Sequence, residues 1–124
     1  MKQVLLVFLG GGLGSILRYL ISKPLNSVVG NFYLGTLTVN IIGCLLIGFI
    51  IGLSARNNLL SYNSTLFLAT GICGGFTTFS AFALEKHTLI KSEEFLPLLL
   101  YAGASILLGI LAVALGLWFS KFTN

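Results

Sequence analysis

The segment Gly71-Ile72-Cys73-Gly74-Gly75-Phe76-Thr77-Thr78-Phe79-Ser80-Ala81-Phe82 lies inside an apolar run that begins near Thr65. Each helical glycine costs about 1 kcal/mol relative to alanine, so the paired glycines favour an interruption of the helix. The two threonines that follow supply hydroxyls that can replace a missing backbone partner. At membrane depth, lipid cannot satisfy the freed carbonyls and amides, so they must face protein, water or an ion. Interrupted helices of this kind hold ion sites in transporters, and the segment therefore points to transport.

The composition excludes a soluble globular domain. Of the 124 residues, 56% are hydrophobic and only 8% are charged, whereas a soluble domain carries roughly 25% charged residues. The net charge is +4, but the cations are dispersed, and a nucleic-acid site would need them clustered. Cys44 and Cys73 lie in apolar runs without metal-ligand spacing, so we interpret them as buried thiols. The length fits a single domain, residues 1–124, surrounded mostly by lipid.

Apolar stretches near or above the length that crosses a bilayer recur along the chain. They cover residues 4–21, 32–53, 65–84 and 95–119, and polar separators lie at 23–27, 54–64 and 86–94. The first stretch lacks a cleavage site and is interrupted by glycines, so we interpret it as a retained helix rather than a signal peptide. The sequence therefore predicts an all-α membrane protein with four transmembrane helices, the third of them broken at mid-membrane.

The positive charges do not select an orientation in the membrane. One side would carry Lys2, Arg56 and Lys121, and the other Arg18, Lys23, Lys86 and Lys91. The bias of Lys and Arg toward the cytoplasmic loops normally sets the topology, and three against four gives no such bias. The count is compatible with a chain that inserts both ways and pairs as an antiparallel dimer. It is equally compatible with a weak signal in a small sample.

The first two spans each carry a polar residue on a face of small residues. On the first, Gly11, Gly14 and Arg18 share one side, which we interpret as a packing face with an interfacial, structural Arg18. On the second, Asn40 follows Thr36 on the same side. An asparagine in mid-span is costly unless it bonds across helices or lines a cavity, and its two amide hydrogens could serve an anion. Both explanations of Asn40 stay open.

Aromatic and hydroxyl groups follow the predicted break. Phe79 and Phe82 are three residues apart and share a helix face. Such a pair often serves only packing, but the positive edges of two phenyl rings can also flank a small anion. Glu85 is either interfacial or part of a pathway, and Tyr101 and Ser105 offer hydroxyls on a small-residue seam of the last span.

Three blocks of this sequence resemble the Fluc (CrcB) family of fluoride channels. Residues 10–19 (GGGLGSILRY) are similar to the family's opening GGxxGaxxRY, and residues 35–43 (GTLTVNIIG) to its GTxxVNxxG helix. Residues 71–82 (GICGGFTTFSAF) resemble its GxxGGxTTFSTF break, with Ala81 where the family commonly has Thr. A second small hydroxyl often follows the last Phe of the family motif, and here Ala83 replaces it.

The resemblance implies an antiparallel, dual-topology homodimer with two fluoride pores and a central structural sodium ion. It places pore side chains at Asn40, Phe79, Ser80, Phe82 and Tyr101, a polar track at Thr36, Glu85 and Ser105, and sodium-binding backbone carbonyls at Gly74 and Thr77. The implied function is passive export of fluoride through the inner (plasma) membrane, which relieves fluoride toxicity. No enzyme activity and no nucleic-acid partner are implied.

Two other functions explain part of the sequence. A small proton-coupled exporter of organic cations would need a buried carboxylate, usually early in the chain, but the acids are Glu85, Glu93 and Glu94. A non-transporting membrane scaffold would explain the glycine seams but leaves the segment 71–82 without a purpose. A nucleotide-dependent enzyme is disfavoured because the glycine-rich start lacks a preceding strand and a downstream acid.

Overall fold

The computed structural model describes residues 1–26, 32–56 and 59–123, and over these ranges the regular structure is helical throughout. The elements in chain order are α1 (Lys2–Asn26), α2 (Leu34–Ala55), α3 (Tyr62–Thr65), η1 (Leu66–Cys73), α4 (Gly74–Phe76), α5 (Phe79–Lys91), α6 (Phe95–Phe119) and η2 (Ser120–Phe122). The segment η1 is a π-helix, and η2 is a 3₁₀ turn. Nothing in the sequence had indicated the π-helical turns.

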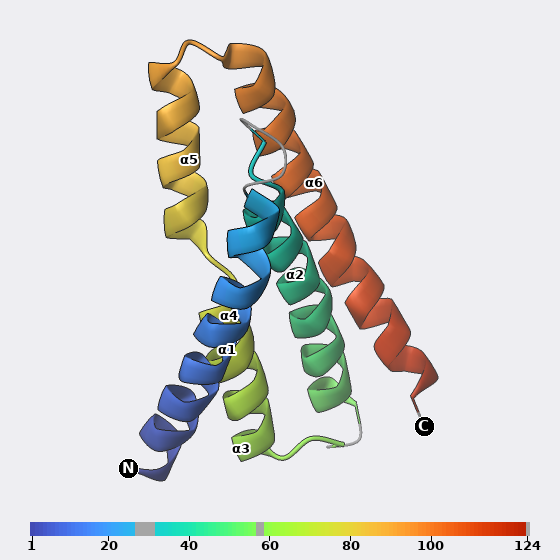
Figure 1. The fold of residues 1–124 in the computed structure, drawn as a ribbon. Helices are drawn as coiled ribbons and strands as arrows, with labels where there is room; N and C mark the ends of the chain where they lie inside the picture. Colours follow the sequence, from blue (N-terminus) through green and yellow to red (C-terminus); the bar gives the residue numbers. More distant parts are fainter. Residues whose placement is uncertain (27–31, 57–58, 124) are drawn as a thin grey trace.

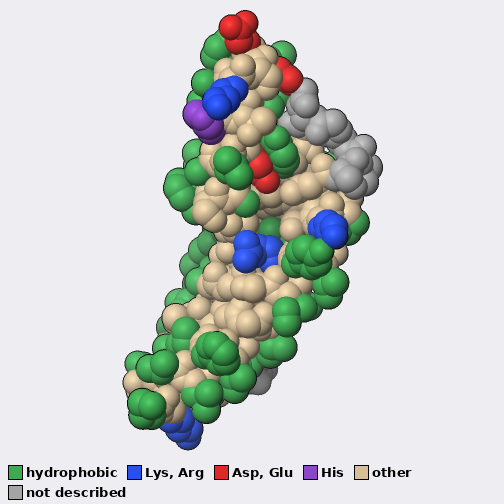
Figure 2. All heavy atoms as spheres, turned by 60° about the vertical axis from the view of Figure 1, so that its left-hand side comes forward, with side chains coloured by type: hydrophobic (Ala, Val, Ile, Leu, Met, Phe, Trp, Pro, Cys, Tyr) green, Lys and Arg blue, Asp and Glu red, His purple; other side chains and the backbone are tan. Residues whose placement is uncertain are grey.

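The prediction of four spans is confirmed within the described part of the chain. The helical segments long and apolar enough to cross a membrane are Lys2–Asn26, Leu34–Ala55, Tyr62–Lys91 and Phe95–Phe122. Large apolar side chains are exposed along them, and Figure 2 shows that hydrophobic groups cover much of the visible surface. Water would not tolerate so much contiguous apolar surface on a monomer, whereas lipid does.

The predicted boundaries were wrong at the ends of two spans. Helix α1 continues through Pro24 to Asn26, and the third segment runs over Tyr62–Lys91 instead of 65–84. Hydropathy marks the part of a helix that lies in hydrocarbon, whereas the backbone hydrogen bonds continue into the polar interface. Parts of the predicted separators, at residues 27 and 57–58, lie outside the described residues.

Lys86 and His87 were expected in the separator between the last two spans, and this expectation was wrong. Both belong to α5, which ends only at Lys91. The side chain of Lys86 is buried, as is that of Glu85, whereas His87 is exposed on the helix. Helix α5 continues through these charged residues because the side of the helix that carries Glu85 and Lys86 is buried in the protein.

The helices form two packed groups. Helices α2 and α6 run side by side over most of their length, and α1 packs on η1, α4 and part of α2. Helix α5 runs from α4 toward the end of the molecule opposite to the two chain ends, and there it approaches α6 (Figure 1). The two ends of the chain lie toward the same end of the molecule (Figure 1), as an even number of crossings requires.

Glycines allow the backbone of α1 to pack closely against that of the third segment. A Cβ atom on Gly14 would lie 2.2 Å from the carbonyl oxygen of Ile72, and one on Gly75 would lie 2.3 Å from that of Gly11. Real Cβ atoms do not approach a backbone oxygen so closely, so these contacts need glycine. Small residues that bring helix backbones together are typical of packing inside membranes.

Candidate functional site

The helical backbone of the third segment is interrupted at Thr77 and Thr78. Their φ and ψ angles are −84° and 156°, and −148° and 119°, which are extended conformations. The glycine pair was expected to cause the interruption, but Gly74 and Gly75 are helical residues of α4. The glycines allow the close approach of α1. The Thr77 amide still donates to the carbonyl of Cys73, whereas Thr78 obtains both of its backbone partners from a neighbouring helix.

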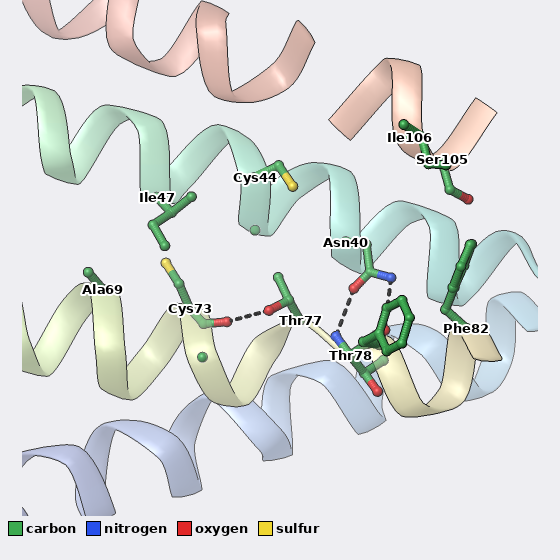
Figure 3. A pocket seen from close by; sticks show the side chains of 13 residues that line it. Asn40, Cys44, Ile47, Ala69, Cys73, Thr77, Thr78, Phe82, Ser105 and Ile106 are labelled. Atoms are coloured by element: carbon green, nitrogen blue, oxygen red, sulfur yellow. Dashed lines mark hydrogen bonds between the residues drawn. The ribbon is translucent and has the colours of Figure 1, made fainter. Parts of the chain in front are cut away.

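Asn40 of α2 supplies that partner. Its Oδ1 accepts a hydrogen bond from the amide of Thr78 at 2.8 Å, and its Nδ2 donates to the carbonyl of Thr78 at 3.1 Å (Figure 3). A side-chain amide that meets both backbone groups of one residue imitates a pair of strand hydrogen bonds and holds Thr78 extended. This arrangement matches the interhelical bonding considered for Asn40, and one Nδ2 hydrogen remains beyond the bond to Thr78.

The interruption also removes helical donors from backbone carbonyls, including those of Gly74 and Thr77. In a continuous α-helix each amide donates to the carbonyl four residues earlier, so the Thr78 amide would bond Gly74 and the Ala81 amide would bond Thr77. Instead, the Thr78 amide donates to Asn40, and the Ala81 amide donates to Oγ1 of Thr78 at 3.2 Å. The second contact makes Thr78 the N-cap of α5. The expectation that a threonine hydroxyl replaces a missing backbone partner is confirmed at Thr78, which had not been named as a site residue.

A pocket of about 400 Å³ lies beside this interruption. Its lining includes Asn40, Gly74, Thr77, Phe79, Phe82 and Ser105 from the set predicted from the sequence, together with Gly43, Cys44, Ile47, Ala69, Cys73, Thr78 and Ile106. Figure 3 shows the side chains of Asn40 and Phe82 on the same side of the pocket. Residues from α2, the third segment and α6 therefore meet at one place, as an ion pathway would require.

The two phenylalanines are close but differ in exposure. Their ring centroids are 5.7 Å apart, with planes inclined at 36°. Phe79 is 79% exposed in the single chain, whereas Phe82 is half-buried. Ser80 is also exposed, and its hydroxyl lies 3.2 Å from that of Thr78. Ser105 donates to the carbonyl of Tyr101 at 2.7 Å, so its oxygen lone pairs are what it presents to the pocket.

A second polar cluster lies on the far side of Phe82. The buried carboxylate of Glu85 accepts one hydrogen bond from Thr36 and another from the hydroxyl of Tyr101, the latter at 2.7 Å. The Tyr101 ring is 5.8 Å from that of Phe82. Of the predicted polar track of Thr36, Glu85 and Ser105, the first two therefore form one hydrogen-bonded group with Tyr101, which was predicted as a pore residue. Ser105 lies apart from this group and lines the pocket.

Asn26 holds Thr36 of this cluster in place, although its position in the sequence had indicated only a separator. Its Oδ1 accepts from the amide of Thr36 at 3.1 Å, and its Nδ2 donates to Oγ1 of Thr36 at 3.2 Å. The first bond satisfies one of the free amides at the start of α2. A sequence signal was absent because the capping side chain comes from the end of the preceding helix.

Arg18 lies at the contact between α1 and α4. Its Nε donates to the carbonyl of Gly75 at 3.1 Å, and the hydroxyl of Ser15 donates to the same oxygen at 3.4 Å. The guanidinium therefore ties two helices together next to the interruption. This placement agrees with a structural role for Arg18 and does not put it in the pocket.

Comparison with protein families matches residues 5–117 to the family described as CrcB-like protein, Camphor Resistance (CrcB). The chain belongs to the CrcB family. Its members of known name include the fluoride-specific ion channel FluC of Phocaeicola vulgatus, 46% identical over 122 residues, which are 98% of this chain and 100% of that protein. FluC of Chlorobium phaeobacteroides is 47% identical over 98% of this chain and 96% of its own.

Membership in the CrcB family confirms the resemblance found in the three sequence blocks. FluC of Flavobacterium psychrophilum is 44% identical over 98% of both chains. The family relatives are ion channels rather than enzymes, and the four apolar spans make this chain a multi-pass membrane protein.

Proposed function

We propose that this chain is a fluoride-selective, passive channel of the plasma membrane that exports fluoride and so relieves its toxicity. One observation carries the proposal: Phe79, Phe82 and Asn40 line one pocket beside an interrupted helix. Relatives aligned over nearly the whole chain are named fluoride-specific ion channels. We place the interruption at mid-membrane, where unsatisfied backbone is found only next to a cavity or protein.

The chemistry of the pocket suits a small anion. Fluoride holds its water tightly, so a selective path must replace that water with donors that release the ion again. The free Nδ2 hydrogen of Asn40 and the hydroxyl of Ser80 are such donors, and the edges of the phenyl rings carry partial positive charge. Phe82 connects the pocket with the Glu85 cluster, so the path continues from the rings toward Thr36 and Tyr101.

The functional unit is an antiparallel homodimer of chains inserted in both orientations. The exposure of Phe79 and Ser80 supports this proposal, because an open pore residue on a single chain needs a second surface to enclose it. The charge count also supports it. Without the buried Lys86 and the helix-bound Arg18, one side keeps Lys2, Arg56 and Lys121 and the other Lys23 and Lys91, so neither orientation is strongly favoured. Two copies related by a two-fold axis in the membrane plane would form two equivalent pores.

A sodium ion at that two-fold axis would be held by the carbonyls of Gly74 and Thr77 from both copies. The loss of their helical donors to Asn40 and Thr78 supports the fit, because such carbonyls are free to bind a cation. Neutral carbonyl ligands suit a monovalent ion, whereas divalent ions normally recruit carboxylates. Exchange into sodium-free buffer with a large organic cation should lower both dimer stability and fluoride flux, and unchanged values would remove sodium from the proposal.

The decisive experiment is anion efflux from liposomes that contain the purified protein. Fluoride should leave rapidly and chloride should be retained, without any imposed proton gradient. Phe79→Ile and Phe82→Ile should each reduce fluoride flux by at least about tenfold, in line with the loss of a few kcal/mol of ion stabilisation. Phe95→Ile, at an exposed position near the start of α6, is the matched control and should conduct normally. Equal fluoride and chloride efflux would refute the proposed function.

A further inference from the structure

Helix α5 carries a buried lysine with no hydrogen-bond partner. Lys86 is only 9% exposed, and its Nζ forms no hydrogen bond with the residues that the structure describes. A buried ammonium is costly unless other groups compensate its charge. The neighbouring carboxylate of Glu85 bonds Thr36 and Tyr101 instead of Lys86. Something other than an ion pair must therefore stabilise this cation.

Two aromatic faces take that role. The Nζ atom of Lys86 lies over the Tyr101 ring, 2.9 Å from its centroid, and over the Phe82 ring, 4.2 Å from its centroid. The ring planes of Phe82 and Tyr101 are inclined at 58°, so the ammonium is held in the angle between them. A cation over an aromatic face is attracted by the negative potential of that face.

The contact with Phe82 changes what this ring offers to an anion. A phenyl ring has a negative face and a positive edge. A cation on the face draws electron density inward from the edge, so the edge becomes more positive. Phe82 lines the pocket beside Asn40 while Lys86 covers its face. The same ring can therefore bind a cation permanently on one side and a passing anion at its edge.

We propose that Lys86 is a positioning residue that raises the affinity of the Phe82 edge for a small inorganic anion through the cation–π contact. This inference rests on the proposed function, because it assumes that fluoride passes the edge of Phe82. Lys86 does not itself bind the ion, since its Nζ is enclosed. Its charge acts on the ion by polarising the Phe82 ring that lies between them.

A simpler role for the lysine would be to neutralise Glu85. In that case the positive charge would matter only while the carboxylate is present, and Glu85→Gln would make Lys86 dispensable. In the proposed role, the lysine acts on Phe82 whether or not Glu85 is charged. The two roles therefore differ in the effect of the same lysine substitution in two backgrounds.

The test measures fluoride efflux from liposomes for Lys86→Met and Lys86→Gln, which remove the charge, and for Lys86→Arg, which keeps it. The neutral variants should lower the flux about 5- to 30-fold, which corresponds to the loss of about 1–2 kcal/mol of ion stabilisation, and should raise the half-saturating fluoride concentration. Lys86→Arg should stay within about twofold of the parent chain, because guanidinium also binds aromatic faces. Lys91→Met, at an exposed lysine of the same helix, is the matched control.

The same substitutions are then made in a Glu85→Gln background, and dimer size and thermal unfolding are measured for each variant. A neutral-variant loss that persists in this background, with the dimer intact, supports the proposal. A loss that disappears there, or neutral variants that conduct like the parent, would overturn it while leaving the channel function untouched. A parent chain without fluoride flux would overturn the channel function together with this inference.

Discussion

Asn40 is the residue on which the interruption depends, because the oxygen and the nitrogen of its side-chain amide both bond the backbone of Thr78. Asn40→Asp would place a second oxygen 3.1 Å from the Thr78 carbonyl, where the donor now lies. We expect the lost bond and the repulsion to cost about 1–3 kcal/mol of stability, and flux should fall steeply. Thermal unfolding and liposome efflux measure both effects, with Asn63→Asp in α3 as the control.

Gly14 tests the close contact between α1 and the third segment. A Cβ there would meet the Ile72 carbonyl oxygen at 2.2 Å and the Phe76 amide nitrogen at 2.8 Å. Both are backbone atoms that cannot rotate away, so Gly14→Ala should destabilise the protein by about 1–3 kcal/mol. Gly12→Ala meets nothing within 4 Å and is the matched control. Equal melting temperatures for the two variants would contradict the described packing.

Among individual residues, the sequence identified as site candidates those whose polar or aromatic side chains are unusual in an apolar segment. Asn40 and the phenylalanine pair were identifiable because a mid-span amide and a same-face aromatic pair are conspicuous in an apolar chain, and both line the pocket. Asn26 was not identifiable, because its role depends on the start of another helix. Lys86 was predicted to lie in a separator because a hydropathy pattern treats every charged side chain as exposed to water. In the structure, the aromatic rings of Phe82 and Tyr101 cover its ammonium group.

Helix α5 begins with a side-chain cap rather than as a continuation of α4. Thr78→Ala removes the oxygen that accepts from the Ala81 amide, and such a loss costs about 0.5–2 kcal/mol. The start of α5 carries Phe79 and Phe82, so flux should decrease along with stability. Thr78→Ser keeps the oxygen and should behave like the parent chain. Circular dichroism, melting temperature and efflux together check this expectation, which a fully active Thr78→Ala would contradict.

The existence of the helices followed from hydropathy, but the inner structure of the third segment did not. Four apolar runs of about 20 residues predict four helices, because each backbone N–H and C=O group in lipid needs a hydrogen-bond partner, and a helix supplies these partners within the run. The π-helix Leu66–Cys73 packs on α1 and α2, and Asn40 of α2 holds Thr78 extended. Local propensity therefore favoured the glycine pair as the interruption, while tertiary hydrogen bonds located it at the threonines.

For the whole molecule, orientation is the property to test. Additional lysines at exposed positions near Lys2 and Lys121 should force one orientation, since local cations set topology. Such a chain alone should lose fluoride flux by at least about tenfold, because an antiparallel partner is no longer formed. Co-expression with a chain biased through lysines near Lys91 should restore the flux. Full activity of a single forced orientation would exclude the antiparallel dimer.

The even number of crossings has a consequence for gene architecture. The two ends of the chain lie toward the same end of the molecule (Figure 1), so two copies joined directly head to tail would enter the membrane in the same orientation. A tandem gene that encodes both halves of the proposed antiparallel pair must therefore add a linker with an odd number of membrane crossings. The shortest such linker is one further hydrophobic helix of about 20 residues.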